Sequence, residues 1–389
     1  MTWQVIPAGV GTSPSTGATR YASIVGAGEG VWYAAEADAV MAVPFGFVVR
    51  GLYVRPASGQ LDAGDGWTLT VRKNGADTSV TVTVLGSTEY EQSELNGVAF
   101  TAFEEIAMKC VPVGTPVGAL LNWGFIIQPT TPNKMCFMGS TGAANLGNNF
   151  YMCSHGVSVG ANSVEYYVQS LWPVAGTITK MLCMLDSAPI LGTSRTFTLR
   201  VNGVDSALVN TMGALSDLQA VSGSIAIAAG DVTSIRTSFT GVPPSTMARA
   251  SIVFEPTEKG LSVFHGCSQT NLGTGQLFNY SSTGGDQWNA GGGDRVSILI
   301  PPFSIYEMHA MLNVAPGAGN TRTIKSLWDI ADVGDNIVFG AADTYGSVAI
   351  RRDSTVNRHF MASTSTSGPP ASRALWSFVS RHPKLQGVY

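Results

Sequence analysis

Charged side chains are scarce in this sequence. Lys, Arg, Asp and Glu make up 12% of the 389 residues, which is about half of the roughly 25% typical of soluble domains. The 22 basic and 26 acidic residues give a net charge of −4, and the nearest approach to a basic run is Arg351-Arg352 with Arg358 and His359. Nucleic-acid binding depends on clustered cations that neutralise phosphates. The sequence therefore predicts no nucleic-acid partner.

Targeting and membrane signals are also missing. The segment from Met1 to Pro7 has no basic stretch followed by an apolar one, so it predicts no signal peptide. We therefore expect synthesis in a cytoplasm. No run of 18 or more apolar residues occurs, so we expect no membrane partner. The five cysteines form no CxxC pair, and such an odd set is typical of buried, reduced thiols: Cys110, Cys136, Cys153, Cys183 and Cys267.

Ligand patterns typical of a zinc site are absent from the sequence. No HxH or HExxH pattern accompanies the five histidines, which are His155, His265, His309, His359 and His382. The segment His265-Gly266-Cys267 is the most suggestive local pair. A loop histidine beside a buried thiol explains it better than a nucleophile with its base, since no further motif surrounds it.

Paired carboxylates give no stronger indication of catalysis. Glu104 and Glu105 are adjacent, so on a strand they would face opposite sides. Asp62 and Asp65 fit a turn better than a calcium loop, which needs more oxygen ligands. The sequence predicts a protein that is not an enzyme, with no catalytic residue, no metal site and no cofactor.

What the sequence does contain is an internal repeat. Asn74-Gly75-Ala76-Asp77 recurs as Asn202-Gly203-Val204-Asp205, a shift of 202 − 74 = 128. Met184 to Pro189 recurs as Met311 to Pro316, and Arg195-Thr196 as Arg322-Thr323, each 127 apart. Asn145-Leu146-Gly147 recurs 126 residues later. Because these landmarks agree within two residues, duplication is the best explanation.

The repeat divides the chain at two polar, proline-containing segments, 128–133 and 255–260. We predict four parts: a Gly- and Ser-rich extended arm over 1–19, and three domains over 20–130, 131–257 and 258–389. The third domain is the most diverged, since Trp328 to Asn336 replaces its Asn-Gly segment. The three domains could lie about a local threefold axis or form a linear stack.

Each repeat has the pattern of β-strands. Thr68–Arg72 and Ser79–Val84 alternate apolar and polar residues around Asn74-Gly75, a pair typical of a type I′ hairpin. A helix is hard to find, and 208–221 is the nearest candidate. Short strands and frequent turns in units of about 120 residues indicate an all-β protein of three tandem β-sandwich domains, of jelly-roll-like type.

The segment Thr196 to Leu208, with its sister Trp67 to Val80, resembles a repeat of tailed-bacteriophage structural proteins. In those proteins a strand, an Asn-Gly-x-Asp turn, a second strand and a Gly-x-Pro segment before a final aromatic strand follow in the same order. Here the last elements are Gly241-Val242-Pro243 and Phe254. The resemblance covers about two thirds of the first two repeats. It implies head-decoration, tail or fibre roles without catalysis.

We therefore expect a structural component of a bacteriophage virion, exposed on the particle exterior and acting through protein–protein assembly. Its partners would be other virion proteins and further copies of itself, with a trimer as the expected oligomer. An alternative is an adhesin that binds a host surface receptor, with Trp288, Tyr280 and Tyr151 as the aromatic nominees. A more remote alternative is a polysaccharide depolymerase. The candidate contact residues, in a Gly-rich loop, are Asp286, Trp288 and Asn289.

Overall fold

The chain folds into three β-sandwiches, each made of two sheets. In the computed structural model, the described residues are 3–9, 12–25, 32–58, 62–86, 91–93, 97–142, 145–157, 162–268, 271–272, 277–280, 284–286, 298–300, 304–328, 331–353, 357–365 and 370–381. Within them the only helical segments are two short 3-10 turns, η1 (Glu36–Asp38) and η2 (Glu165–Val168). The predicted all-β, multi-domain sandwich fold is confirmed.

Unit 1 comprises β1 to β10. Its first sheet has the order β1 (Gln4–Gly9), β10 (Leu120–Pro129), β4 (Phe47–Ser58) and β7 (Glu91–Ser93), with β8 (Val98–Phe100) also paired to β4. Its second sheet has the order β2 (Arg20–Ala22), β9 (Glu105–Val113), β5 (Gly66–Lys73) and β6 (Ala76–Leu85), with β3 (Met41–Ala42) paired to β9.

Unit 2 comprises β11 to β20. One sheet has the order β13 (Gly156–Val157), β11 (Met135–Ser140), β20 (Ala248–Pro256), β15 (Gly176–Leu185) and β18 (Leu218–Ile227). The other has the order β12 (Phe150–Met152), β19 (Val232–Thr240), β16 (Ser194–Val201) and β17 (Val204–Met212), with β14 (Ser170–Leu171) paired to β19. The weak helix candidate, 208–221, therefore lies in β17, a turn and β18.

Unit 3 comprises β21 to β30 and repeats the strand order of unit 2 strand for strand. One sheet has the order β23 (Gly284–Asp286), β21 (Ser262–Ser268), β30 (Ala374–Arg381), β25 (Ser304–Leu312) and β28 (Tyr345–Asp353). The other has the order β22 (Leu277–Tyr280), β29 (Asn357–Ser365), β26 (Arg322–Trp328) and β27 (Ala331–Phe339), with β24 (Ile298–Ile300) paired to β29.

The predicted Asn-Gly hairpins join β5 to β6 and β16 to β17. Both residues of each turn have positive φ: 49° at Asn74, 77° at Gly75, 50° at Asn202 and 76° at Gly203, as a type I′ turn requires. Unit 3 keeps a hairpin at the same place, since Trp328 pairs with Ala331 across β26 and β27. The Asn-Gly sequence is therefore one solution to this turn and not a requirement of the fold.

The extended arm predicted for 1–19 is wrong for Gln4–Gly9. This segment is β1, an edge strand paired antiparallel with β10 from Gln4↔Ile127 to Gly9↔Asn122. Ile6 packs in the core of unit 1, whereas Val5 packs in the core of unit 3. Because β1 is buried on both faces, it lacks the alternation of apolar and polar residues by which the other strands were predicted.

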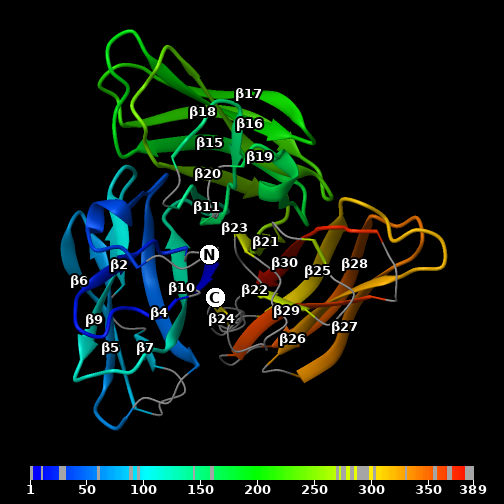
Figure 1. Ribbon diagram of the computed structural model, residues 1–389, viewed down its shortest axis with the longest axis horizontal. Helices are drawn as coiled ribbons and strands as arrows, with labels where there is room; N and C mark the ends of the chain where they lie inside the picture. The colour runs from blue at the N-terminus through cyan, green and yellow to red at the C-terminus, as the bar shows by residue number, and fades with distance from the viewer. Residues whose placement is uncertain are drawn as a thin grey trace.

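The three units surround a common centre, where β1 (dark blue), β11 and β21 lie (Figure 1). These strands are equivalent, because Val5, Cys136 and Val263 pair with Ile126, Val253 and Val379 of the final strand in their own units. Each of the three residues packs into the core of a neighbouring unit: Val5 into unit 3, Cys136 into unit 1 and Val263 into unit 2. The contacts therefore close a ring with threefold pseudo-symmetry, not a linear stack.

Candidate functional site: the junction of the three units

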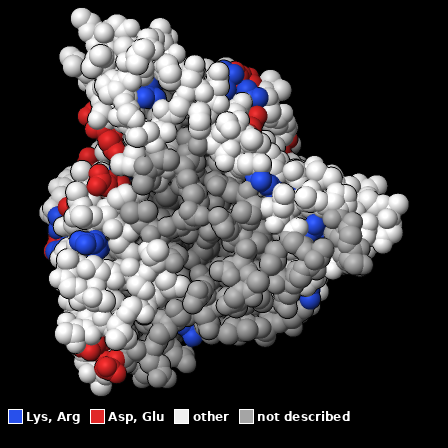
Figure 2. Space-filling view, viewed as in Figure 1, with Lys and Arg blue, Asp and Glu red and all other residues white. Residues whose placement is uncertain are grey.

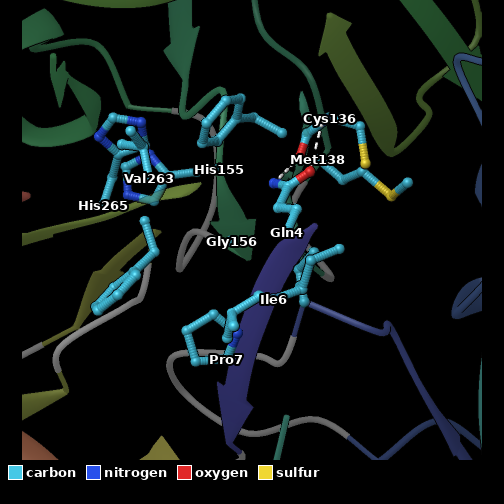
Figure 3. A pocket seen from close by; sticks show the side chains of 13 residues that line it. Gln4, Ile6, Pro7, Cys136, Met138, His155, Gly156, Val263 and His265 are labelled. Carbon is cyan, nitrogen blue, oxygen red and sulfur yellow. Dashed lines mark hydrogen bonds between the residues drawn. The ribbon is translucent and has the colours of Figure 1, made fainter. Parts of the chain in front are cut away.

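A small cavity lies where the central strands meet. It is lined by residues of β1, β11 and β21, together with Val25, His155 and Gly156 (Figure 3). Gln4 reaches from β1 to β11, where its side-chain amide donates to the Cys136 carbonyl (2.6 Å) and accepts from the Cys136 amide (2.8 Å). The cavity volume is about 30 Å³. Since one water needs roughly 10–15 Å³ by this measure, the space accommodates water-sized molecules.

Two histidines from different units meet beside this cavity. The ring centroids of His155 and His265 are 5.2 Å apart, and both side chains are buried. His265 Nδ1 donates to the carbonyl oxygen of Leu171 (2.7 Å), and His155 Nδ1 lies 2.6 Å from Ser170 Oγ. Burial, reinforced by the charge of His155, lowers the pKa of His265 well below its usual value. His265 is therefore a neutral core residue at neutral pH.

Two buried thiols lie close to these histidines. The Sγ atoms of Cys153 and Cys267 are 3.9 Å apart. Hydrogen bonds from Cys153 and His155 lower the pKa of the Cys267 thiol, although its burial opposes them. Burial raises the pKa of Cys153. The residue between His265 and Cys267 must be Gly266, because a Cβ there would lie 2.2 Å from the indole nitrogen of Trp376.

This geometry explains the His265-Gly266-Cys267 segment. It lies in strand β21, not in a loop as expected, and its thiol is buried as expected. A nucleophile needs a base and a space for the substrate, whereas this thiol is fully buried and is not among the residues that line the cavity. Within the described part of the chain, no group of three or more His, Cys, Asp or Glu could hold a metal ion.

The predicted contact loop is only partly described. Asp286 ends β23, whose backbone pairs with Ser268 of β21, while Trp288 and Asn289 lie outside the described residues. Tyr280, one aromatic nominee of the adhesin alternative, lies in β22. The other, Tyr151, is half-buried beneath the guanidinium of Arg200, which is 5.7 Å from its ring.

The carboxylates considered from sequence have structural roles. Asp62 and Asp65 bracket a turn closed by the hydrogen bond from Asp65 N to Asp62 O (3.0 Å), and Asp65 Oδ1 accepts from Thr115 N (2.9 Å). Glu104 accepts from Thr101 N (2.7 Å) and pairs with Lys73. These contacts lower the pKa of Glu104.

Sequence reasoning missed an arginine at the base of each Asn-Gly hairpin. Arg200 binds Glu165 of η2 (Nε–Oε1 2.9 Å), Asp205 and the carbonyl of Gly203. Arg72 makes the same contacts with Glu36 of η1, Asp77 and Gly75. An arginine two residues before each Asn-Gly was a visible signal, but its partners in η1 and η2 lie 36 and 35 residues away, respectively.

A second missed pair consists of buried arginines that fix loops of the sandwich. Arg195 Nη2 donates to the carbonyl of Pro244 (2.7 Å), and Arg322 Nη2 donates to those of Leu272 (3.0 Å) and Pro370 (3.1 Å). These are the arginines of the repeated Arg-Thr motif. The equivalent residue in unit 1 is Trp67, whose indole N–H donates to the Ser15 carbonyl (3.3 Å).

The helical turns η1 and η2 each contact the following unit. Arg249 of unit 2 donates to the carbonyls of Ala37 (3.1 Å) and Asp38 (2.8 Å). The guanidinium of Arg373 in unit 3 stacks 3.2 Å above the ring of Tyr167, and the hydroxyl of Tyr166 donates to the Arg373 carbonyl (2.8 Å). The polar groups of the junction therefore hold the units together.

Charge on the surface is sparse. Figure 2 shows scattered Lys and Arg on one face of the molecule, and the described residues on that face form no continuous basic area. None of the described helical segments is long and apolar enough to span a membrane.

Comparison with known proteins places the chain in no family. No family model matches it, and no curated protein is similar to it in sequence. Among solved structures, it is similar to the M60 catalytic domain with two CBM51 domains of Clostridium perfringens ZmpB, at 10% identity and a TM-score of 0.19. The match covers 88% of this chain and 33% of that one, so this chain spans about a third of its length. At this TM-score the likeness carries no argument about function.

Proposed function

We propose that this chain is a structural subunit of a bacteriophage particle, exposed on the particle exterior and acting through protein–protein assembly. The observation that supports this most is the closed ring, in which the first strand of each unit contributes to the core of a neighbour. Head-to-tail contacts that close by rotation build ring-shaped assemblies. Here one chain contains such a ring within itself.

The contacts made by the buried ionisable side chains support the same proposal. The histidines His155 and His265, the buried arginines Arg195 and Arg322, and the carboxylate Glu165 all bind other parts of the same chain. An enzyme places such groups around space for a substrate, whereas the cavity described at this junction has a volume of about 30 Å³. The proposed subunit is therefore an assembly protein without catalysis, made in the host cytoplasm and carried in the virion.

The test is to locate the chain in particles. Particles purified from the source culture would be labelled with an antibody against the whole chain, imaged by electron microscopy and digested for mass spectrometry. We expect the chain in multiple copies per particle, with label on the exterior. Particles without the chain would contradict the proposal.

Two further measurements address the alternatives. Purified chain incubated with host polysaccharide should release no reducing ends, and release would support a depolymerase. Purified chain should not bind intact host cells; saturable binding that competes with adsorption of the particle would support an adhesin.

A further inference from the structure

The contact between units 2 and 3 contains a pair of thiols. Cys153 directly follows β12 of unit 2, and Cys267 lies in β21 of unit 3. Both are fully buried in one apolar cluster with Val168, Leu171 and Leu375. Their Sγ atoms lie 3.9 Å apart, in hydrogen-bonding contact.

The equivalent contact between units 1 and 2 contains serines instead. Ser140 of β11 matches Cys267 of β21, because they pair with the equivalent residues Arg249 and Leu375 of the final strands. Ser23 follows β2 as Cys153 follows β12. Both serines are buried and bind locally: Ser23 Oγ lies 2.8 Å from Met41 Sδ, and Ser140 Oγ accepts from Gly142 N. Packing of these positions therefore does not require sulfur.

The two thiols differ in how readily they ionise. Hydrogen-bonding contacts with Cys153 and His155 lower the pKa of Cys267, whereas burial raises the pKa of Cys153. Burial also raises the pKa of the remaining three thiols, Cys110, Cys136 and Cys183. Because the thiolate is the reactive form, Cys267 is the thiol of this chain best suited to react, with Cys153 beside it to complete the reaction.

We propose that Cys153 and Cys267 are a cross-linking site, at which a peroxide oxidises the two thiols to a disulfide that joins unit 2 to unit 3. The Cys267 thiolate attacks one peroxide oxygen, the O–O bond breaks, and the hydroxide released takes up the proton from Cys267. The sulfenic acid formed is attacked by Cys153, so that the S–S bond forms and the S–O bond breaks. Water leaves with the proton of Cys153. Two thiols are oxidised and hydrogen peroxide is reduced to two waters.

The cavity beside this site is large enough for hydrogen peroxide. His155, which binds Cys267, also lines the central cavity, whose volume suits water-sized molecules, and hydrogen peroxide is only slightly larger than water. The sulfur atoms are 3.9 Å apart and must approach by about 1.9 Å to reach the bonding distance of about 2.05 Å. The bond would close a loop of 267 − 153 = 114 residues and restrict the unfolded chain accordingly.

The experiment uses the full chain, reduced and then exposed to hydrogen peroxide. Peptide mapping without reductant should show the peptides of Cys153 and Cys267 joined, with the loss of two hydrogen atoms. The unfolding temperature should rise on oxidation and return to its original value with dithiothreitol. Peroxide treatment that leaves the two peptides separate, or that joins either cysteine to a different one, would overturn the proposal.

Matched variants separate the cross-link from general oxidation. C153S places at this contact the residue that unit 1 has at Ser23, so it is expected to fold, and peroxide should no longer raise its unfolding temperature. C183S removes a buried thiol of unit 2 and should retain both the cross-link and the shift. A shift that persists in C153S would refute the assignment. Should C153S not fold, the peptide map of the unaltered chain decides the question by itself.

Discussion

Units 2 and 3 share one strand order but fix equivalent positions with different side chains. The hairpin of unit 2 is held by Arg200, bound to Glu165 and Asp205. In unit 3 the equivalent pair is Leu327 and Asp332 across β26 and β27, and Leu327 is buried. On the central strand, Met138 of unit 2 corresponds to His265 of unit 3, since they pair with Ser251 and Ser377. The fold thus tolerates exchange of polar clusters for apolar packing, while in every unit one residue of the first strand (Val5, Cys136 or Val263) stays packed in the core of a neighbouring unit.

We expect the largest loss of stability from a substitution that disrupts the ring at the contact between units 2 and 3. Val263 lies in β21 of unit 3 but packs in the core of unit 2. V263D would bury a carboxylate there, and we expect it to lower the free energy of unfolding by more than about 3 kcal/mol. Urea unfolding measures this.

A matched control is V338D, since Val338 is 61% exposed and its substitution should cost less than about 0.5 kcal/mol. Equal losses for the two variants would show that the contact between units 2 and 3 contributes little to stability.

The second prediction concerns Arg200 in the hairpin of unit 2, which is replaced by leucine, the residue at the equivalent position 327 of unit 3. R200L leaves Glu165, whose side chain is 17% exposed, without its arginine, and we expect a loss of about 2 kcal/mol. R72L in unit 1 should behave alike. A double-mutant cycle with E165L measures the coupling, which should exceed about 0.5 kcal/mol. If R200L is as stable as the unaltered chain, the polar cluster does not hold the hairpin.

The third prediction concerns pH and His265. Its pKa is held well below the usual value by burial, so the unfolded chain takes up a proton at about pH 6.5 while the folded chain does not. Stability should therefore be full above that pH and fall by up to about 1.4 kcal/mol per pH unit below it, until the folded pKa is reached.

The variant H265M carries the unit 2 residue at this position and should flatten the profile. Urea unfolding at about pH 7 and about pH 5 measures the difference. His309, whose pKa is also lowered by burial, provides the comparison. H309Q should retain most of the decrease in stability below about pH 6.5, because we attribute that decrease to His265. An unchanged slope in H265M would assign the pH dependence to another group.

The smallest effect is expected at the turn itself. Asn202 has a φ of 50°, and its side chain accepts from Val232 N (3.0 Å) and donates to Asp231 (2.8 Å). N202A should cost about 1 kcal/mol, because alanine is strained at positive φ and both hydrogen bonds are lost. N202G relieves the strain and should cost less. The opposite order in thermal unfolding would show that side-chain bonding outweighs the backbone conformation.

The features predicted correctly were those that depend on neighbouring residues. The hairpin at Asn74-Gly75 follows from two positions that accept positive φ, and β5 and β6 follow from alternating side chains. Strand β1 was missed because its two buried faces belong to different units. The candidate loop at Asp286, Trp288 and Asn289 was chosen by composition, and the structure shows only that Asp286 lies in a strand beside β21.

The sequence by itself determined the strands, the hairpins and the threefold repetition, because each depends on backbone preference and on patterns within one unit. Only the tertiary structure decided that the repeats form a closed ring, that Val5 belongs to the core of unit 3, and that Cys153 lies against Cys267. These contacts join residues more than a hundred positions apart, and no local pattern encodes which of three similar surfaces a strand will meet.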